Sequence, residues 1–140
     1  MALRRFALIF GIVFLIVGAG GFIPGLVAPH SHPDVTVTSG LGLELSLFPI
    51  NVLHNIVHLL FGVWGLLASR SDAGARAYAK AVAIIYALLT VMGLVPALRL
   101  DTTFGLVPLY GNDIWLHALL AIGAGYFGFA RRGDDVVRRA

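Results

Sequence analysis

Long apolar runs divide the chain into four segments. Residues 6–33, 45–69 and 81–98 contain no Lys, Arg, Asp or Glu, and residues 102–130 contain only Asp113. Because a helix needs roughly 20 apolar residues to cross a bilayer, each run is long enough for one span. The pattern predicts an all-α membrane protein, a single domain over residues 1–140. We expect transmembrane helices at residues 5–26, 47–69, 77–98 and 112–130, and a long outer loop at residues 27–46.

The basic residues gather at three places along the chain, and their distribution predicts its orientation. Nine of the ten Lys and Arg lie before the first run, between the second and third runs, or after the fourth, and Arg99 lies alone on the other side. Cytoplasmic loops carry an excess of Lys and Arg. Both termini are therefore predicted to face the cytoplasm, in a multi-pass membrane protein. The net charge of +3 is explained by topology and needs no nucleic-acid partner.

The composition narrows the class of protein further. The chain is 59% hydrophobic and 12% charged, whereas a soluble domain carries about 25% charged residues. A soluble enzyme, a DNA-binding domain and a disordered chain are excluded on this ground. The chain contains no cysteine, which excludes disulfides, thiolate metal sites, iron–sulfur clusters and a cysteine nucleophile. Any chemistry must come from five histidines, a few carboxylates, hydroxyls and amides.

The four segments are predicted to be two copies of one helical hairpin. A shift of 72 residues superimposes the first helix on the third, and a shift of 59 superimposes the second on the fourth. The difference leaves an insertion of 13 residues in the first outer loop. Both copies begin on the same side of the membrane, so the repeats are parallel and their axis runs along the membrane normal. The matched pairs include Gly21 with Gly93, Pro24 with Pro96, Pro49 with Pro108, His54 with Asp113 and His58 with His117.

A polar stripe follows the second helix and a shorter one follows the fourth. Asn51, His54, Asn55 and His58 share one helical face, and Asp113 and His117 share another because they are four residues apart. Exposing these faces to lipid costs several kcal/mol, so both should point into the bundle. We expect a cluster near its extracytoplasmic end, with the asparagines around it. The predicted cluster is His54, His58, Asp113 and His117, and the supporting residues are Asn51, Asn55 and Asn112.

Three imidazoles and one carboxylate are a suitable ligand set for a divalent transition metal, Zn²⁺ above all, and also for Fe, Mn or Cu. Two other interpretations stay open. The buried side chains could satisfy one another as a polar network that holds the two hairpins in register. Alternatively, His58 and His117 could be the axial ligands of a haem, although the small residues of these helices leave little room for it.

A second candidate site lies in the outer loop, where His30 and His32 stand between two prolines. A His-x-His pair at this place could capture a metal from outside, although such histidines are more often exposed and inert. Asp34 and Glu44 could assist, but nothing in the sequence fixes their geometry.

The polar segments also carry a resemblance. The sequence N-x-x-H-N-x-x-H at residues 51–58, N-D-x-x-x-H at residues 112–117 and G-F-I-P-G at residues 21–25 are similar to a family of small bacterial four-helix membrane proteins of unknown function. The resemblance covers nearly the whole chain and implies the fold, the topology and a place in the bacterial inner (plasma) membrane, but no activity. Val52 stands where proline is usual, and the long histidine-bearing outer loop is not typical of the family.

Three functions remain open on these observations. We favour a structural or accessory subunit of a larger membrane protein complex, because the chain is small and its inner loops are short. A metal-dependent membrane hydrolase is the alternative, in which the metal would activate water. No separate carboxylate is in place as a base, however, once Asp113 is a ligand. A bis-histidine haem protein or redox carrier is the third.

Overall fold

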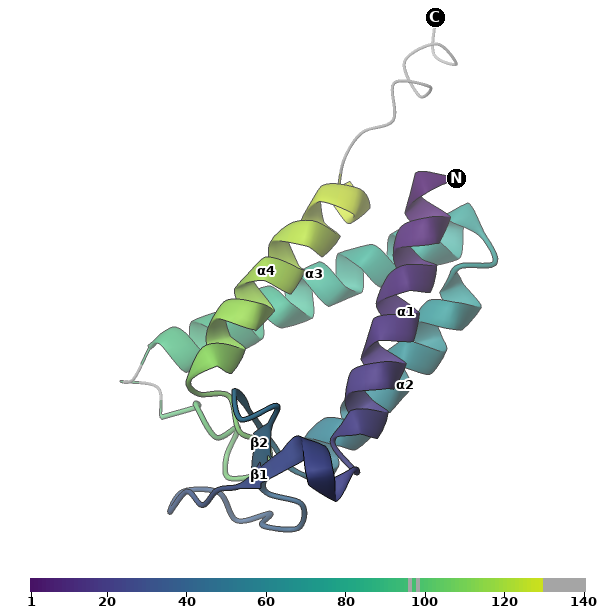
Figure 1. Ribbon diagram of the computed structural model, residues 1–140. Coiled ribbons are helices and arrows are strands. Elements are labelled where there is room, and N and C mark those ends of the chain that lie inside the picture. The colour runs from purple at the N-terminus through teal and green to yellow at the C-terminus, as the bar shows by residue number, and fades with distance from the viewer. Residues whose placement is uncertain (96, 98, 130–140) are drawn as a thin grey trace, which may run out of the picture.

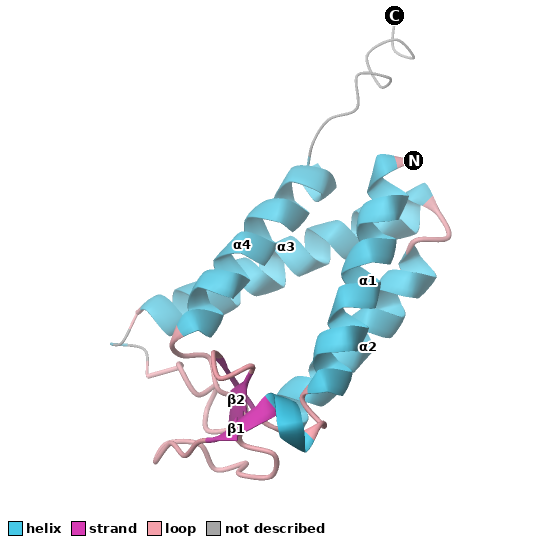
Figure 2. Cartoon of the chain, viewed as in Figure 1, coloured by secondary structure: helices cyan, strands magenta, loops and turns pink. Residues whose placement is uncertain are grey.

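The computed structural model describes residues 1–95, 97 and 99–129. Its main elements are four α-helices, with three short strands between the first and second (Figures 1 and 2). The expected ends of the third and fourth helices, at residues 98 and 130, and the C-terminal arginines lie outside the described residues. The helix bounds are α1 Ala2–Gly20, α2 Val52–Ala68, α3 Asp72–Leu94 and α4 Asn112–Phe129.

The helices begin and end where local chemistry requires. α1 ends at Gly20, six residues before the expected end, and Pro24 then opens a short 3-10 turn, Pro24–Leu26. α3 begins five residues before the expected start because the Ser71 side chain accepts a hydrogen bond from the Gly74 amide and Asp72 favours the positive helix N-terminus. α3 ends at Leu94, two residues before Pro96, and the residue that precedes a proline disfavours helical geometry.

A three-stranded antiparallel sheet lies where the sequence pattern predicts loop and the first turn of the second helix. The strands β1 Val27–Pro29, β2 Gly42–Glu44 and β3 Phe48–Ile50 pair in the order β1-β2-β3. The two prolines lie on the edge strands, where the missing amide is tolerated, and the central strand has none. The expectation of a purely helical protein is corrected to this extent, and the second helix begins at Val52 rather than at residue 47.

The helices pack as two pairs, α1 against α2 and α3 against α4 (Figure 1). The sheet and the connections at residues 21–51 and 99–111 lie together at one end of the molecule, which we call the loop end, and the N-terminus lies at the other. The pairing agrees with two hairpins, while the internal repeat in the sequence stays a prediction.

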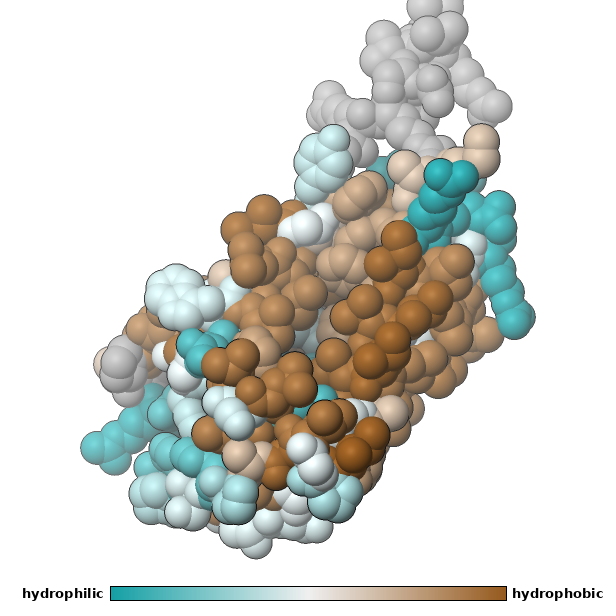
Figure 3. All heavy atoms as spheres, in the orientation of Figure 1, coloured by the Kyte–Doolittle hydropathy of each residue, from teal (hydrophilic) through white to brown (hydrophobic). Residues whose placement is uncertain are grey.

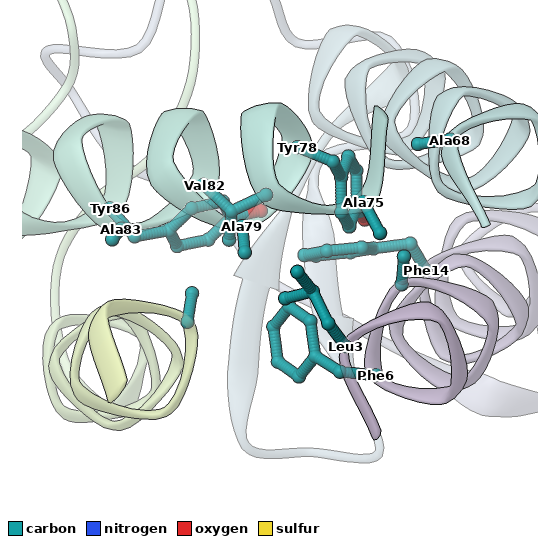
Figure 4. Packing of buried hydrophobic residues seen from close by; sticks show 12 residues of the cluster. Leu3, Phe6, Phe14, Ala68, Ala75, Tyr78, Ala79, Val82, Ala83 and Tyr86 are labelled. Carbon is teal, nitrogen blue, oxygen red and sulfur yellow. The ribbon is translucent and has the colours of Figure 1, made fainter. Parts of the chain in front are cut away.

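The hydrophobic core lies between the two helix pairs. Figure 4 shows Leu3 and Phe6 from α1 and Tyr78 from α3 pointing into this space. The Phe6 ring also stacks on Phe127 of α4, with 4.6 Å between the ring centroids. Alanines at the contacts, among them Ala79 and Ala124, let the helices approach closely.

Two helices, α1 and α3, are long and apolar enough to cross a membrane, and α2 is a shorter apolar helix. Only 33% of the apolar segment of α1 and of α3 is buried within the molecule. The remainder forms an exposed hydrophobic surface, and Figure 3 shows such residues over the middle of the visible face with hydrophilic residues at both ends. Large contiguous apolar surfaces of this kind mark contact with a membrane or with another protein.

Candidate functional site

The polar cluster lies in the first two turns of α2 and α4, next to the loop end. Asn51 sets the start of α2, because its Oδ1 accepts a hydrogen bond of 3.0 Å from the His54 amide. Its Nδ2 donates to the carbonyls of Val37 (3.0 Å) and Leu106 (2.7 Å), one from each long connection. Asn51 was expected beside the ligands. The structure places its side chain where it caps the helix and joins both connections above the cluster.

His54 is buried, and one of its two ring nitrogens is already engaged. Its Nδ1 lies 3.2 Å from the Pro49 carbonyl of β3. A carbonyl only accepts, so Nδ1 carries the proton and Nε2 has a free lone pair. Metal-binding histidines usually donate their second ring nitrogen to a carbonyl or carboxylate in this way. This partner could not be predicted from the sequence, because a hydrogen bond to a backbone carbonyl requires no particular residue type.

Asp113 and His117 come from consecutive turns of α4, as their spacing predicts. The His117 Nε2 lies 3.4 Å from the Asp113 Oδ2, and their side chains are only 2% exposed. The His117 ring also contacts the Tyr86 ring of α3 edge to face, with centroids 4.8 Å apart. One ligand atom each from His54, Asp113 and His117 can be chosen so that all three lie within 4.8 Å of one another. Two helices from different pairs therefore supply one buried donor group, which could hold a metal ion.

His58, the fourth predicted ligand, lies outside this group of three. Its ring contacts the His54 ring, with 4.4 Å between centroids, and the Phe14 ring of α1, with 5.5 Å. A Cβ added to Gly18 would lie 3.0 Å from the His58 Cβ. His58 is thus held against α1, one turn deeper than His54.

Several buried polar atoms of the site have no hydrogen-bond partner among the described residues. Both amide atoms of Asn55 are unpartnered, and this side chain lies against Gly21, which has no Cβ that would collide with it. Buried polar groups are almost always hydrogen-bonded, and the described side chains do not supply the partners of these atoms. The other unpartnered atoms of the site are His58 Nδ1, His117 Nδ1 and Asp113 Oδ2.

Asn112, the third predicted supporting residue, is exposed at the start of α4. Its Nδ2 donates to the Leu47 carbonyl at 3.3 Å. It therefore joins α4 to the segment before β3, and the structure does not bring its side chain into the buried group.

The outer-loop histidines share a partner that the sequence analysis missed, Tyr110. His30 Nε2 lies 3.0 Å from the Tyr110 hydroxyl, and the His32 ring stacks on the Tyr110 ring with centroids 4.4 Å apart. Burial, and then the nearby Asp101 carboxylate, raise the pKa of Tyr110, which keeps its hydroxyl protonated. The only sequence feature that could have indicated this contact is the tyrosine itself, in the connection before α4. No acidic residue joins these two histidines in a candidate metal group within the described ranges.

Comparison with known proteins gives a family and no activity. The model of one family, described as Domain of unknown function (DUF4383), matches residues 4–130. No curated protein matches the chain, and no solved structure does.

Proposed function

The chain belongs to the DUF4383 family, whose description states no activity, and we propose a function from the chain's own residues. The protein is a four-span membrane protein of the bacterial plasma membrane with both termini in the cytoplasm. It is an accessory or structural subunit of a membrane complex, and it binds one divalent transition metal ion. The ligands are His54, Asp113 and His117, and Zn²⁺ is the preferred ion.

One observation carries the metal proposal. Three buried side chains, from two helices in different pairs, offer ligand atoms within 4.8 Å of one another. Imidazole nitrogen and carboxylate oxygen are ordinary zinc ligands, and three protein ligands leave a fourth position open. The bond from His54 Nδ1 to the Pro49 carbonyl supports this assignment, because it leaves Nε2 available for the ion.

The surroundings of Asp113 also favour a cation. Its carboxylate is 2% exposed, and its one ion-pairing neighbour in the described part of the chain is His117. An imidazole is a cationic partner only when it is protonated, and a buried carboxylate whose charge is not compensated is costly, most of all at membrane depth. A divalent ion neutralises the charge and satisfies the unpartnered Oδ2 at the same time.

The arrangement favours a structural role over the alternatives. A metal bound to α2 and α4 would fasten one helix pair to the other. Among the described residues no second carboxylate belongs to the group, so the base that a hydrolase needs is not supplied there. Three donor atoms within 4.8 Å of one another suit one small ion. The haem alternative needs His58 as an axial ligand, and His58 is not a member of this group.

Metal analysis of the purified protein tests the proposal. In detergent with added Zn²⁺, wild type should hold close to one metal per chain, measured by mass-spectrometric elemental analysis. Removal of a residue that only hydrogen-bonds a metal ligand weakens metal binding roughly 10- to 100-fold. Each of the variants His54→Ala, Asp113→Asn and His117→Ala removes a ligand, so each should weaken metal binding by at least this factor. The matched control is His58→Ala, which should keep its metal because His58 lies outside the group.

Two outcomes would contradict the proposal. Folded wild type that stays metal-free would exclude the ion and return the site to a polar network. Loss of metal from His58→Ala alone, with the other variants still loaded, would place the ion elsewhere. The accessory role has its own test in mild-detergent purification, where co-elution with a larger complex is expected and isolation as a lone catalyst would refute it.

A further inference from the structure

A pocket of about 350 Å³ lies at the end opposite the loop end, where the start of α1 meets the turn between α2 and α3. Three arginines dominate its wall, and no acidic residue lines it within the described part of the chain. Asp72 follows Arg70 by two positions but does not line the pocket. The lining residues are Met1, Arg4, Arg5, Leu8, Ser69 and Arg70.

The arginines differ in how firmly they are held. Arg4 Nε donates a hydrogen bond of 2.8 Å to the Ser69 carbonyl, which ties the start of α1 to the end of α2. This bond leaves the other guanidinium nitrogens of Arg4 available. Arg5 and Arg70 also line the pocket and are exposed. Guanidinium groups bind phosphate oxygens by paired, charge-assisted hydrogen bonds.

The apolar surface beside the pocket suits a lipid better than a soluble anion. Leu8 lines the pocket itself, and exposed residues continue from it along α1 (Ile9, Ile12, Val13 and Ile16). A ligand with a phosphate group and hydrocarbon chains would match both surfaces. In the proposed topology this end faces the cytoplasmic leaflet, where basic pockets beside membrane helices bind anionic headgroups.

We propose that this pocket binds the phosphate headgroup of an anionic phospholipid of the cytoplasmic leaflet, with its acyl chains along the exposed face of α1. The proposal rests on the membrane-spanning part of the proposed function and is independent of the metal site.

Native mass spectrometry of the purified protein tests the proposal directly. Protein supplied with phosphatidylglycerol or with phosphatidylcholine of the same chain length should retain the anionic lipid preferentially. An arginine near an anionic surface contributes about 1 kcal/mol, equivalent to about fivefold in affinity, so Arg5→Gln/Arg70→Gln should bind about 30-fold more weakly. Arg4 is left intact, because its bond to Ser69 could matter for folding. The matched control is Arg99→Gln, an exposed arginine of the loop end, which should bind as wild type does.

A second measurement uses wild type alone and does not depend on how the variants fold. The retained phosphatidylglycerol should fall as salt is raised and should resist a large excess of inorganic phosphate, which lacks the acyl chains. Equal retention of the two lipids, or equal loss in Arg99→Gln and in the double variant, would refute the site. Displacement by inorganic phosphate would overturn its assignment to a lipid. The double variant should keep its metal, so failure here and failure of the metal proposal are distinguishable.

Discussion

At the scale of single residues, the described part of the chain buries two carboxylates in different surroundings. Asp113 lies beside the imidazole of His117 in the candidate metal group. Glu44, on β2, is 6% exposed and packs against Gly20, where an added Cβ would lie 2.6 Å from its Oε1. No Lys or Arg forms an ion pair with Glu44 among the described residues. In the proposed function the Asp113 carboxylate binds the metal ion, whereas the Glu44 carboxylate has no role.

Burial raises the pKa of Glu44 above its ordinary value, which sets the sign of a pH effect. The folded state disfavours the ionised carboxylate. The contribution of Glu44 to the free energy of unfolding is therefore fully present below its pKa in the unfolded chain, and it is lost as the pH rises through its pKa in the folded protein. Glu44→Gln removes the charge and should raise the unfolding temperature at neutral pH. Below the ordinary glutamate pKa of about 4.3, the difference from wild type should disappear.

Thermal unfolding in detergent, followed by circular dichroism at several pH values, measures this effect. Asp34→Asn, at an exposed loop position, is the control and should change stability by less than about 0.5 kcal/mol at every pH. A Glu44→Gln protein that is less stable than wild type at neutral pH would show that the carboxylate has a stabilising partner.

At the scale of elements, glycines set how closely α1 approaches α2. A Cβ on Gly11 would lie 2.8 Å from the Leu66 nitrogen and 2.9 Å from the Gly62 oxygen, both backbone atoms that cannot turn aside. A Cβ added to Gly65 on α2 would in turn lie 2.7 Å from the Gly11 Cα. Small residues at such contacts are the usual means by which helices pack in lipid. Nearer the loop end, Gly18 allows α1 to lie close to His58, whose Cβ would be 3.0 Å from a Cβ added to Gly18.

Gly11→Ala should therefore destabilise the protein, by about 1–3 kcal/mol, the usual effect of overpacking. The matched control is Gly123→Ala on α4, where the nearest atom to an added Cβ is Phe10 Cζ at 3.8 Å. Because alanine favours a helix over glycine by about 1 kcal/mol, this control should be neutral or stabilising. Denaturant unfolding in detergent compares the free energies of unfolding of the two variants. Equal values would mean that α1 and α2 can move apart to accommodate the added methyl group.

The same scale shows what could be predicted from the sequence. Uninterrupted apolar runs predict the four helices, and the spacing of Asp113 and His117 predicts their shared face. The helix bounds depend on caps and prolines, and β3 forms from residues 48–50 because pairing with β2 overrides the apolar pattern. The position of His58 depends on how α2 is rotated about its axis relative to Gly18 of α1. Packing between the two helices determines that rotation, so the sequence of α2 alone does not predict it.

At the scale of the whole molecule, hydrophilic residues lie at both ends and an exposed apolar surface lies between them (Figure 3). The loop end holds the sheet and both long connections, while the opposite end holds Arg4, Arg5 and Arg70. In a bilayer this division predicts the loop end outside and the arginines inside.

Single-cysteine labelling tests this orientation, and the cysteine-free chain needs no prior engineering. In intact cells a membrane-impermeant maleimide should label Thr38→Cys, in the long connection before β2. It should label Ala73→Cys, at the start of α3, only after permeabilisation, since both positions are exposed. The reverse pattern would invert the topology, and labelling of both in intact cells would exclude a spanning protein.

The hydrogen bond from His54 to the Pro49 carbonyl has a consequence for how the site can evolve. Side-chain acceptors beside metal ligands are lost by a single substitution, but a main-chain oxygen survives any change of residue at position 49. A point mutation at position 49 therefore leaves the tautomer of His54 unchanged. The tautomer depends on the backbone path of β3. Substitutions along β3 can then occur without a change of this tautomer, provided that the strand itself keeps its place.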